Sequence, residues 1–274
     1  MEKIPTLWQI YQKLDCQEKT KDGICWIQCN TKSSKTVAIF HGVTGGKIDM
    51  MPLAERYVGL GYAVYAFDLP GHGGSKMLPF RSYDDMADWM TRALDCLGRP
   101  INVLISNSFS SSIVYHLMRK ELLPESMKII MGCPTPDPSR LADVLQSLSN
   151  HLPHKLGWSI YNSKPAQKIR VVAALQTKRE DAWQWLSESE RYKKETLTLD
   201  DSNVLTTLLY RQNPYQGVIS DVYDVSIVMG GKDNIITART PEIICQLIPH
   251  AQLIIAPEAG HILHFEAIDQ YPEV

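Results

Sequence analysis

The chain alternates between short apolar runs and segments whose apolar residues recur every three or four positions. The short runs lie at residues 35–40, 62–67, 101–105, 127–131, 225–229 and 252–255, and each is typical of a strand. Helical spacing marks residues 50–60, residues 82–97, the segment after residue 108 and residues 240–247. Strands that alternate with helices in this way predict an α/β fold with a doubly wound, mostly parallel sheet.

Two features frame this alternation. Near the N-terminus, residues 14–19 and 24–30 flank Lys21-Asp22-Gly23, which predicts a β-hairpin with a glycine at the turn. From residue 134 to 217 the alternation stops, and a polar stretch with several aromatics reads as helices without strands. An insertion between two parallel strands predicts a helical cap over the strand ends, where ligands bind. We therefore expect a core of residues 1–133 and 218–274, with a helical cap insertion at 134–217.

Composition narrows the class of protein. The 274 residues fit one large domain with an insertion, and a net charge of −2 without a basic stripe argues against nucleic acid as a partner. The N-terminus lacks the layout of a signal peptide, and no apolar stretch approaches the length of a membrane span. The six cysteines are scattered and form no C-x-x-C pair, which predicts reduced thiols in a cytoplasmic protein. Histidines and cysteines lack ligand spacing, so we expect no metal and no other cofactor. The oligomeric state stays open.

Ser108 stands where a predicted strand meets a helical pattern. The segment Ser106-Asn107-Ser108-Phe109-Ser110 follows the run at 101–105, and this is the layout of a nucleophile elbow, in which a serine sits at the apex of a sharp turn. The usual form is Gly-x-Ser-x-Gly, and here serines replace both glycines. The flanking residues must be small because the apex is strained and its flanks approach each other. The same segment also fits a serine-rich loop that caps a helix.

Three further candidates for chemistry follow predicted strands. His41-Gly42 comes after residues 35–40, Asp233 after 225–229 and His261 after 252–255. A serine hydroxyl is a poor nucleophile and needs a base within hydrogen-bond reach. Each candidate alone has a simpler interpretation, because an aspartate after a strand is most often a turn or N-cap residue. Their joint occurrence at strand ends favours catalysis.

With the order Ser108, Asp233, His261, the sequence resembles the α/β-hydrolase superfamily. The resemblance is carried by His41-Gly42-Val43, by Asp68-Leu69-Pro70-Gly71-His72-Gly73-Gly74-Ser75, by the Ser108 segment, by Asp233, and by Gly260-His261 with Glu266 after it. It implies the α/β-hydrolase fold, with Ser108 as nucleophile, His261 as base and Asp233 as the acid that orients the base. It also implies that the backbone N–H groups of Val43 and Phe109 form the oxyanion hole.

Each of these roles has a rival in the sequence. Ser110 also has small neighbours, but it lies too far from the predicted strand end to be the apex. His264 lacks a preceding glycine, and Asp137 is the rival acid because some family members place the acid after the corresponding strand. The glycine-rich stretch at 68–75 lacks the Gly-Lys-Ser/Thr ending of a P-loop, so we interpret it as a structural loop.

The leading hypothesis is a serine hydrolase that cleaves a carboxylic ester or thioester through an acyl-enzyme intermediate, with a small-molecule acyl ester or thioester as substrate. Cap aromatics could line an acyl pocket or simply form the core of the cap: Trp158, Tyr161, Trp183, Trp185 and Tyr192. One alternative is an acyltransferase or lyase-like enzyme on the same triad, because the loop at 68–75 is similar to that of a menaquinone-pathway synthase and the elbow to that of bacterial acyl transferases. Another is a non-catalytic binding protein on a hydrolase scaffold.

Overall fold

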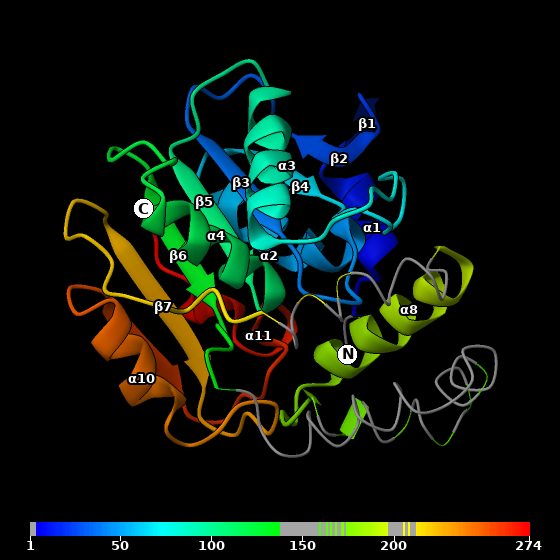
Figure 1. The fold of residues 1–274 in the computed structure, drawn as a ribbon. Coiled ribbons are helices and arrows are strands. Elements are labelled where there is room, and N and C mark those ends of the chain that lie inside the picture. The colour runs from blue at the N-terminus through cyan, green and yellow to red at the C-terminus, as the bar shows by residue number, and fades with distance from the viewer. Residues whose placement is uncertain are drawn as a thin grey trace.

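The structure is a computed structural model. It describes residues 4–137, 174–196 and 212–274, together with Ser159, Ser163, Pro165, Lys168, Val171, Val172, Leu205 and Leu208. In this part of the chain an eight-stranded sheet has the order β1-β2-β4-β3-β5-β6-β7-β8, and helices cover both of its faces (Figure 1).

The sheet is mostly parallel, as the alternating pattern predicted. The pairs β1–β2 and β2–β4 are antiparallel, and every later pair is parallel. The strands are β1 (Gln17–Lys21), β2 (Ile24–Cys29), β3 (Thr36–Phe40), β4 (Ala63–Phe67), β5 (Val103–Asn107), β6 (Lys128–Gly132), β7 (Val225–Gly230) and β8 (Gln252–Ala256). The central strands β3, β4 and β5 are buried at every position because helices pack on both sides of them.

Two groups of helices bury the two faces. One face packs against α3 (Tyr83–Asp95), α4 (Phe109–Arg119) and α10 (Thr240–Leu247). The other packs against α1 (Leu7–Lys13), α2 (Met51–Gly59) and α11 (Leu263–Glu266), with the short 3-10 turns η1 (Lys47–Met50) and η2 (Ile268–Gln270) beside them. Ser82 caps α3 at its N-terminus, since its hydroxyl accepts a hydrogen bond from the N–H of Asp85.

The predicted hairpin exists, but its first strand begins three residues later than the sequence pattern indicated. Residues 14–16 do not belong to a strand, because they follow the end of the helix α1, whose C-cap is Leu14. The sequence analysis overlooked this helix, which begins with a capping box formed by Thr6 and Gln9. The turn lies where it was predicted. Asp22 and Gly23 have φ of 53° and 78°, and two successive positive φ values match the right-handed twist of the flanking strands.

About half of the expected cap insertion lies outside the described residues, so its bounds stay a prediction. Within it, α8 (Glu180–Thr196) rests against the N-terminal segment (Figure 1). The indole N–H of Trp185 donates to the carbonyl of Pro5 at 2.8 Å, and the N–H of Leu7 donates to Glu188 at 2.8 Å. Long-range bonds of this kind join α8 to the core.

The proposed acyl-pocket aromatics have different surroundings. Trp158 and Tyr161 lie outside the described residues. Trp185 is buried against Phe265, with the ring centroids 6.0 Å apart, so it belongs to the core beneath α8. Trp183 is partly exposed to solvent.

All six cysteines are free thiols. Among the described residues, no helix combines the length and the apolar character that crossing a bilayer requires.

Candidate active site

Ser108 makes the turn from strand to helix alone. β5 ends at Asn107 and α4 begins at Phe109, and between them Ser108 has φ 53° and ψ −115°. A side chain at this φ is strained, and the surrounding bonds must hold it there. The N–H of Ser108 donates to the carbonyl of Gly132 at 2.7 Å, and its carbonyl accepts from the N–H of Ser111 at 2.9 Å. The segment is therefore an elbow and not a capped loop.

The serines that replace the usual glycines take part in the turn. Ser106 and Ser110 are both fully buried. The Ser110 hydroxyl accepts from the N–H of Asn107 at 2.7 Å and lies 3.1 Å from the carbonyl of Phe40, to which it can donate. The Ser106 hydroxyl lies 3.2 Å from that of Ser111. Small polar flanks thus fit the close approach and add hydrogen bonds across the turn.

The structure brings together the three side chains of the predicted triad. His261 Nε2 lies 2.9 Å from Ser108 Oγ, and His261 Nδ1 lies 2.7 Å from Asp233 Oδ2. Because a carboxylate only accepts, Nδ1 carries the proton toward Asp233, which leaves the lone pair of Nε2 for the serine hydroxyl. This arrangement is the one that general-base activation of a serine requires.

Burial and charge act against each other on this pair. Burial disfavours the charged form of Asp233, but the facing His261 and the N–H of Ile235, at 2.8 Å, lower the pKa of the carboxyl below its ordinary value. Burial also disfavours the imidazolium of His261. Asp233 outweighs that effect and raises the pKa of His261 above its ordinary value, with a smaller contribution from Glu266.

The loop after β3 lies directly against Ser108. A Cβ added to Gly42 would lie 3.0 Å from the Cβ of Ser108, so a larger residue would push the two segments apart and glycine favours this close approach. The next residue is Val43, whose N–H was predicted as an oxyanion donor together with that of Phe109. No acceptor among the described residues takes a hydrogen bond from either N–H, so both donors are available to a ligand.

His41 holds this loop in place. Its Nε2 accepts from the N–H of Leu69 at 2.9 Å, so the proton lies on Nδ1, which donates to the carbonyl of Gly42 at 2.6 Å. Burial and the neighbouring His72 keep the pKa of His41 well below its ordinary value, so the ring stays neutral. His41 therefore has a positioning role and does not compete with His261.

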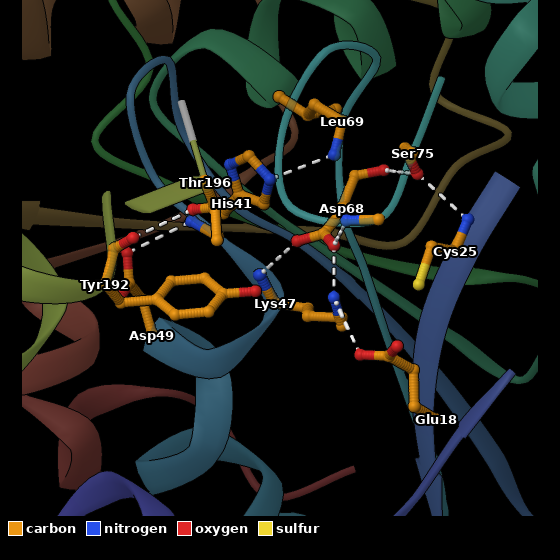
Figure 2. A network of polar contacts seen from close by, with 12 residues as sticks. Glu18, Cys25, His41, Lys47, Asp49, Asp68, Leu69, Ser75, Tyr192 and Thr196 are labelled. Carbon is orange, nitrogen blue, oxygen red and sulfur yellow. Dashed lines mark hydrogen bonds and ion pairs between the residues drawn. The ribbon is translucent and has the colours of Figure 1, made fainter. Parts of the chain in front are cut away.

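A buried ion pair fastens the same loop to the glycine-rich loop (Figure 2). The Asp68 carboxylate binds the ammonium of Lys47, and it also accepts from the backbone N–H groups of Lys47 at 2.8 Å and Gly74 at 2.9 Å. Glu18 lies 3.1 Å from the same ammonium. The stretch at 68–75 is therefore structural, as predicted. The sequence analysis missed Lys47, because its burial depends on a partner 21 positions away and not on a local pattern.

The rival residues do not take the places of Ser108, Asp233 and His261. Asp137 accepts a hydrogen bond from the hydroxyl of Thr237, so its carboxylate is already bound away from His261. Ser110 lies in the first turn of α4. Burial, with Lys193 and His261 nearby, lowers the pKa of His264 to about 3, so this ring stays neutral.

One group of side chains in the described part of the chain has ligand atoms close enough for a metal ion. Cys133, Asp233 and His261 each place one such atom within 4.8 Å of the others. Two of these atoms already form the Asp233–His261 hydrogen bond, and burial raises the pKa of the Cys133 thiol well above its ordinary value. A metal here would have to displace the bond that orients His261 and deprotonate a buried thiol, so the donor set fits a metal poorly.

Comparison with known proteins points to one family and one fold. The model of the Alpha/beta hydrolase family matches residues 37–273. Similar solved structures include a candidate lipase from Acinetobacter baumannii AYE, with a TM-score of 0.75 and 18% identity over 96% of this chain and 90% of that chain. An esterase from Exiguobacterium antarcticum has a TM-score of 0.70 and 17% identity over 88% and 89%. A serine hydrolase from Cycloclasticus zankles has 0.68 and 15% over 92% of both chains. No curated protein sequence matches this chain. At these identities the likeness to solved structures shows the shared fold alone.

Proposed function

The chain belongs to the alpha/beta hydrolase family, and from that premise we propose that it is a serine hydrolase that cleaves a carboxylic ester through an acyl-enzyme intermediate. The observation that carries the proposal is the continuous hydrogen-bond chain from Ser108 through His261 to Asp233, at 2.9 and 2.7 Å. It starts from a serine held in the strained conformation of an elbow. Nucleophile, base and orienting acid stand in the order and geometry that acyl transfer to a serine needs.

In the first half of the proposed reaction, His261 Nε2 takes the proton of the Ser108 hydroxyl as Oγ attacks the carbonyl carbon of the ester. The π electrons of the carbonyl move to its oxygen, and the N–H groups of Val43 and Phe109 stabilise the resulting oxyanion. One such donor is worth roughly 3–4 kcal/mol in the transition state. Collapse of the tetrahedral intermediate breaks the bond to the alcohol, which leaves with the proton from Nε2.

In the second half, water takes the place of the alcohol. His261 Nε2 removes a proton from water, the hydroxide attacks the acyl carbon, and the bond to Ser108 Oγ breaks as the serine regains a proton. Asp233 stays ionised throughout and stabilises the imidazolium that forms in each half. No cofactor takes part. We also propose that residues 134–217 form a helical cap over this site, because Trp185 of α8 packs against Phe265 of α11, the helix that follows His261.

A fluorophosphonate probe tests the nucleophile. Such a probe phosphonylates a serine only where a base and an oxyanion hole activate it. The wild-type protein should be labelled and Ser108→Ala should not. Ser187→Ala is the control, since it removes an exposed hydroxyl of α8 and leaves the elbow and the triad intact. A folded wild-type protein that resists the probe, or labelling that survives in Ser108→Ala, would rule out Ser108 as the nucleophile.

A panel of acyl substrates tests the reaction itself. Nitrophenyl esters with short and long acyl chains, and thioesters with the same acyl groups, should be compared by kcat/KM. Mass spectrometry of the intact protein then detects the acyl-enzyme. We expect hydrolysis of the esters, with water as the acceptor. If an added alcohol or thiol deacylates the acyl-enzyme but water does not, the reaction is acyl transfer on the same residues, and this proposal is wrong.

A further inference from the structure

We propose that Glu266 is a positioning residue for His261, and that it ties the loop of the base to residues 174–177, the segment that leads into α8. The inference rests on the proposed function, because it takes His261 to be the catalytic base. Glu266 is buried, lies in the short helix α11, and does not touch Ser108 or Asp233 in the hydrogen bonds described above. Nothing in the reaction just proposed uses it.

The carboxylate of Glu266 binds the backbone on both sides of the base. Its Oε2 accepts from the N–H of Gly260 at 2.9 Å, and its Oε1 accepts from the N–H of Ile262 at 3.1 Å. These are the residues directly before and after His261. Two bonds from one carboxylate therefore set the orientation of the peptide groups that carry the imidazole.

The same carboxylate also reaches across to the insertion. Its Oε2 accepts from the N–H of Gln176 at 2.8 Å. The N–H of His261 donates to the carbonyl of Ala174 at 2.9 Å. A Cβ on Gly260 would lie 2.6 Å from that carbonyl, so only glycine permits the contact. The loop of the base and residues 174–177 are thus joined backbone to backbone, with Glu266 binding both.

Glu266 acts in its ionised form. Both carboxylate oxygens face N–H donors, so a proton on either oxygen would oppose a donor and have no acceptor. Burial raises the pKa of Glu266, and the N–H donors of Gly260, Gln176 and Ile262 limit that rise. A buried negative charge with no cation among these partners favours the charged form of a neighbouring base, and it raises the pKa of His261.

The charges around His261 decide how its titration responds. Asp233 faces it from the loop after β7, and Glu266 and His264 face it from α11. The thiol of Cys133, after β6, lies beside Asp233 and is neutral. Asp233 and Glu266 both favour the imidazolium, whereas His264 is uncharged. Removal of the Glu266 charge should therefore lower the pKa of His261 and extend activity to lower pH.

Glu266→Gln tests both parts of the proposal. The amide keeps the size of the side chain but presents NH₂ to N–H donors, so the loop of the base loses part of its support. We expect kcat to fall on the order of 10²-fold, as for a displacement of about 1 Å, with KM nearly unchanged. The acid limb of kcat/KM should move to lower pH. A purely structural residue would lower the active fraction without moving this limb.

Two further variants complete the experiment. Glu258→Gln makes the same change of charge three positions before His261, but its side chain is exposed and pairs with Lys232, so kcat and the acid limb should match those of the wild type. Gly260→Ala keeps the Glu266 charge and pushes the loop of the base away from Ala174. We therefore expect kcat to fall, while the acid limb of kcat/KM stays near its wild-type pH.

The outcomes separate this inference from the proposed function. A wild-type protein that neither reacts with fluorophosphonate nor hydrolyses esters would remove the proposed function. If the wild type is active, a folded Glu266→Gln with wild-type kcat and an unmoved limb would overturn the positioning role alone. Should Glu266→Gln not fold, as judged by its thermal melt, Gly260→Ala still decides, because wild-type kcat in that variant would show that the contact with residues 174–177 does not position the base.

Discussion

The elbow at Ser108 and the loop at His261 both present a side chain of the proposed triad at the end of a parallel strand, but they are held in opposite ways. Ser108 is fixed by its immediate surroundings, through the core carbonyl of Gly132 and the first turn of α4. His261 is fixed from a distance, by Asp233 after another strand and by the carbonyl of Ala174 in the insertion.

This contrast predicts whether a variant in each region changes stability, activity or both. The elbow shares its hydrogen bonds with the core of the protein, so a change there should affect stability and activity together. The base is held by contacts outside the sheet, with the side chains of Asp233 and Glu266 and with the backbone carbonyl of Ala174. A change at Asp233, which bonds no strand, should affect activity more than the thermal melt.

The largest expected effect is that of Asp233→Asn. The amide oxygen stays on the N–H of Ile235, so the NH₂ group faces Nδ1 and donates to it. This favours the tautomer that points a proton at Ser108, and we expect kcat to fall about 10⁴-fold. The melting temperature should change little, because Asp233 bonds His261 and a loop N–H but no core strand. Steady-state hydrolysis of the preferred nitrophenyl ester and a thermal melt measure the two quantities.

Asp137→Asn is the matched control for this variant. Asp137 is the rival acid of the sequence, and its carboxylate binds Thr237 instead of His261. We expect kcat to stay within a few-fold of the wild type. If Asp137→Asn lost activity as severely as Asp233→Asn, the base would depend on both acids, and the contrast between the two regions would need another explanation.

The two regions also differ in how far the sequence predicted them. The strands, the turn at Ser108 and the proximity of Ser108, Asp233 and His261 could be predicted, because each depends on local spacing or on the carboxyl ends of parallel strands. The support of the base could not. Glu266 stood in the sequence as part of a family pattern, but its partner Gln176 lies 90 positions away, and no periodicity links the two.

The same reason explains the other omissions. Lys47 lies among buried residues, although a lysine is normally predicted to be exposed. Its burial can be understood only from its ion pair with Asp68. The helix α1 was missed because its cap, Thr6, precedes only two buried positions, Leu7 and Ile10. Short elements that depend on tertiary packing give weak periodic signals.

A smaller effect is expected in the elbow, where Ser106→Val tests the need for small flanks. Ser106 is fully buried beside Ser111, so the extra methyl group overpacks the turn and the hydroxyl contact is lost. We expect the free energy of unfolding to fall by about 2–3 kcal/mol, and kcat to fall with it. Chemical denaturation and ester hydrolysis measure the two changes.

Ser106→Gly is the matched variant and restores the usual elbow spelling. It removes the hydroxyl contact without adding bulk, so the loss of stability should be about 1 kcal/mol and kcat should stay close to that of the wild type. Equal losses in the two variants would show that the hydroxyl, and not the available space, holds the turn.

The smallest expected effect concerns the pH dependence of kcat/KM and the contributions of His261 and His264 to it. His261 must be neutral to accept the serine proton, and Asp233 raises its pKa. The acid limb of kcat/KM should therefore follow a single ionisation, with its midpoint above the ordinary pKa of histidine. His264 has a pKa of about 3 and is neutral over this range, so His264→Gln should leave the midpoint where it is. If the midpoint moves in His264→Gln, a second group of this loop titrates together with His261. The pKa of His261 would then depend on more than its contacts with Asp233 and Glu266.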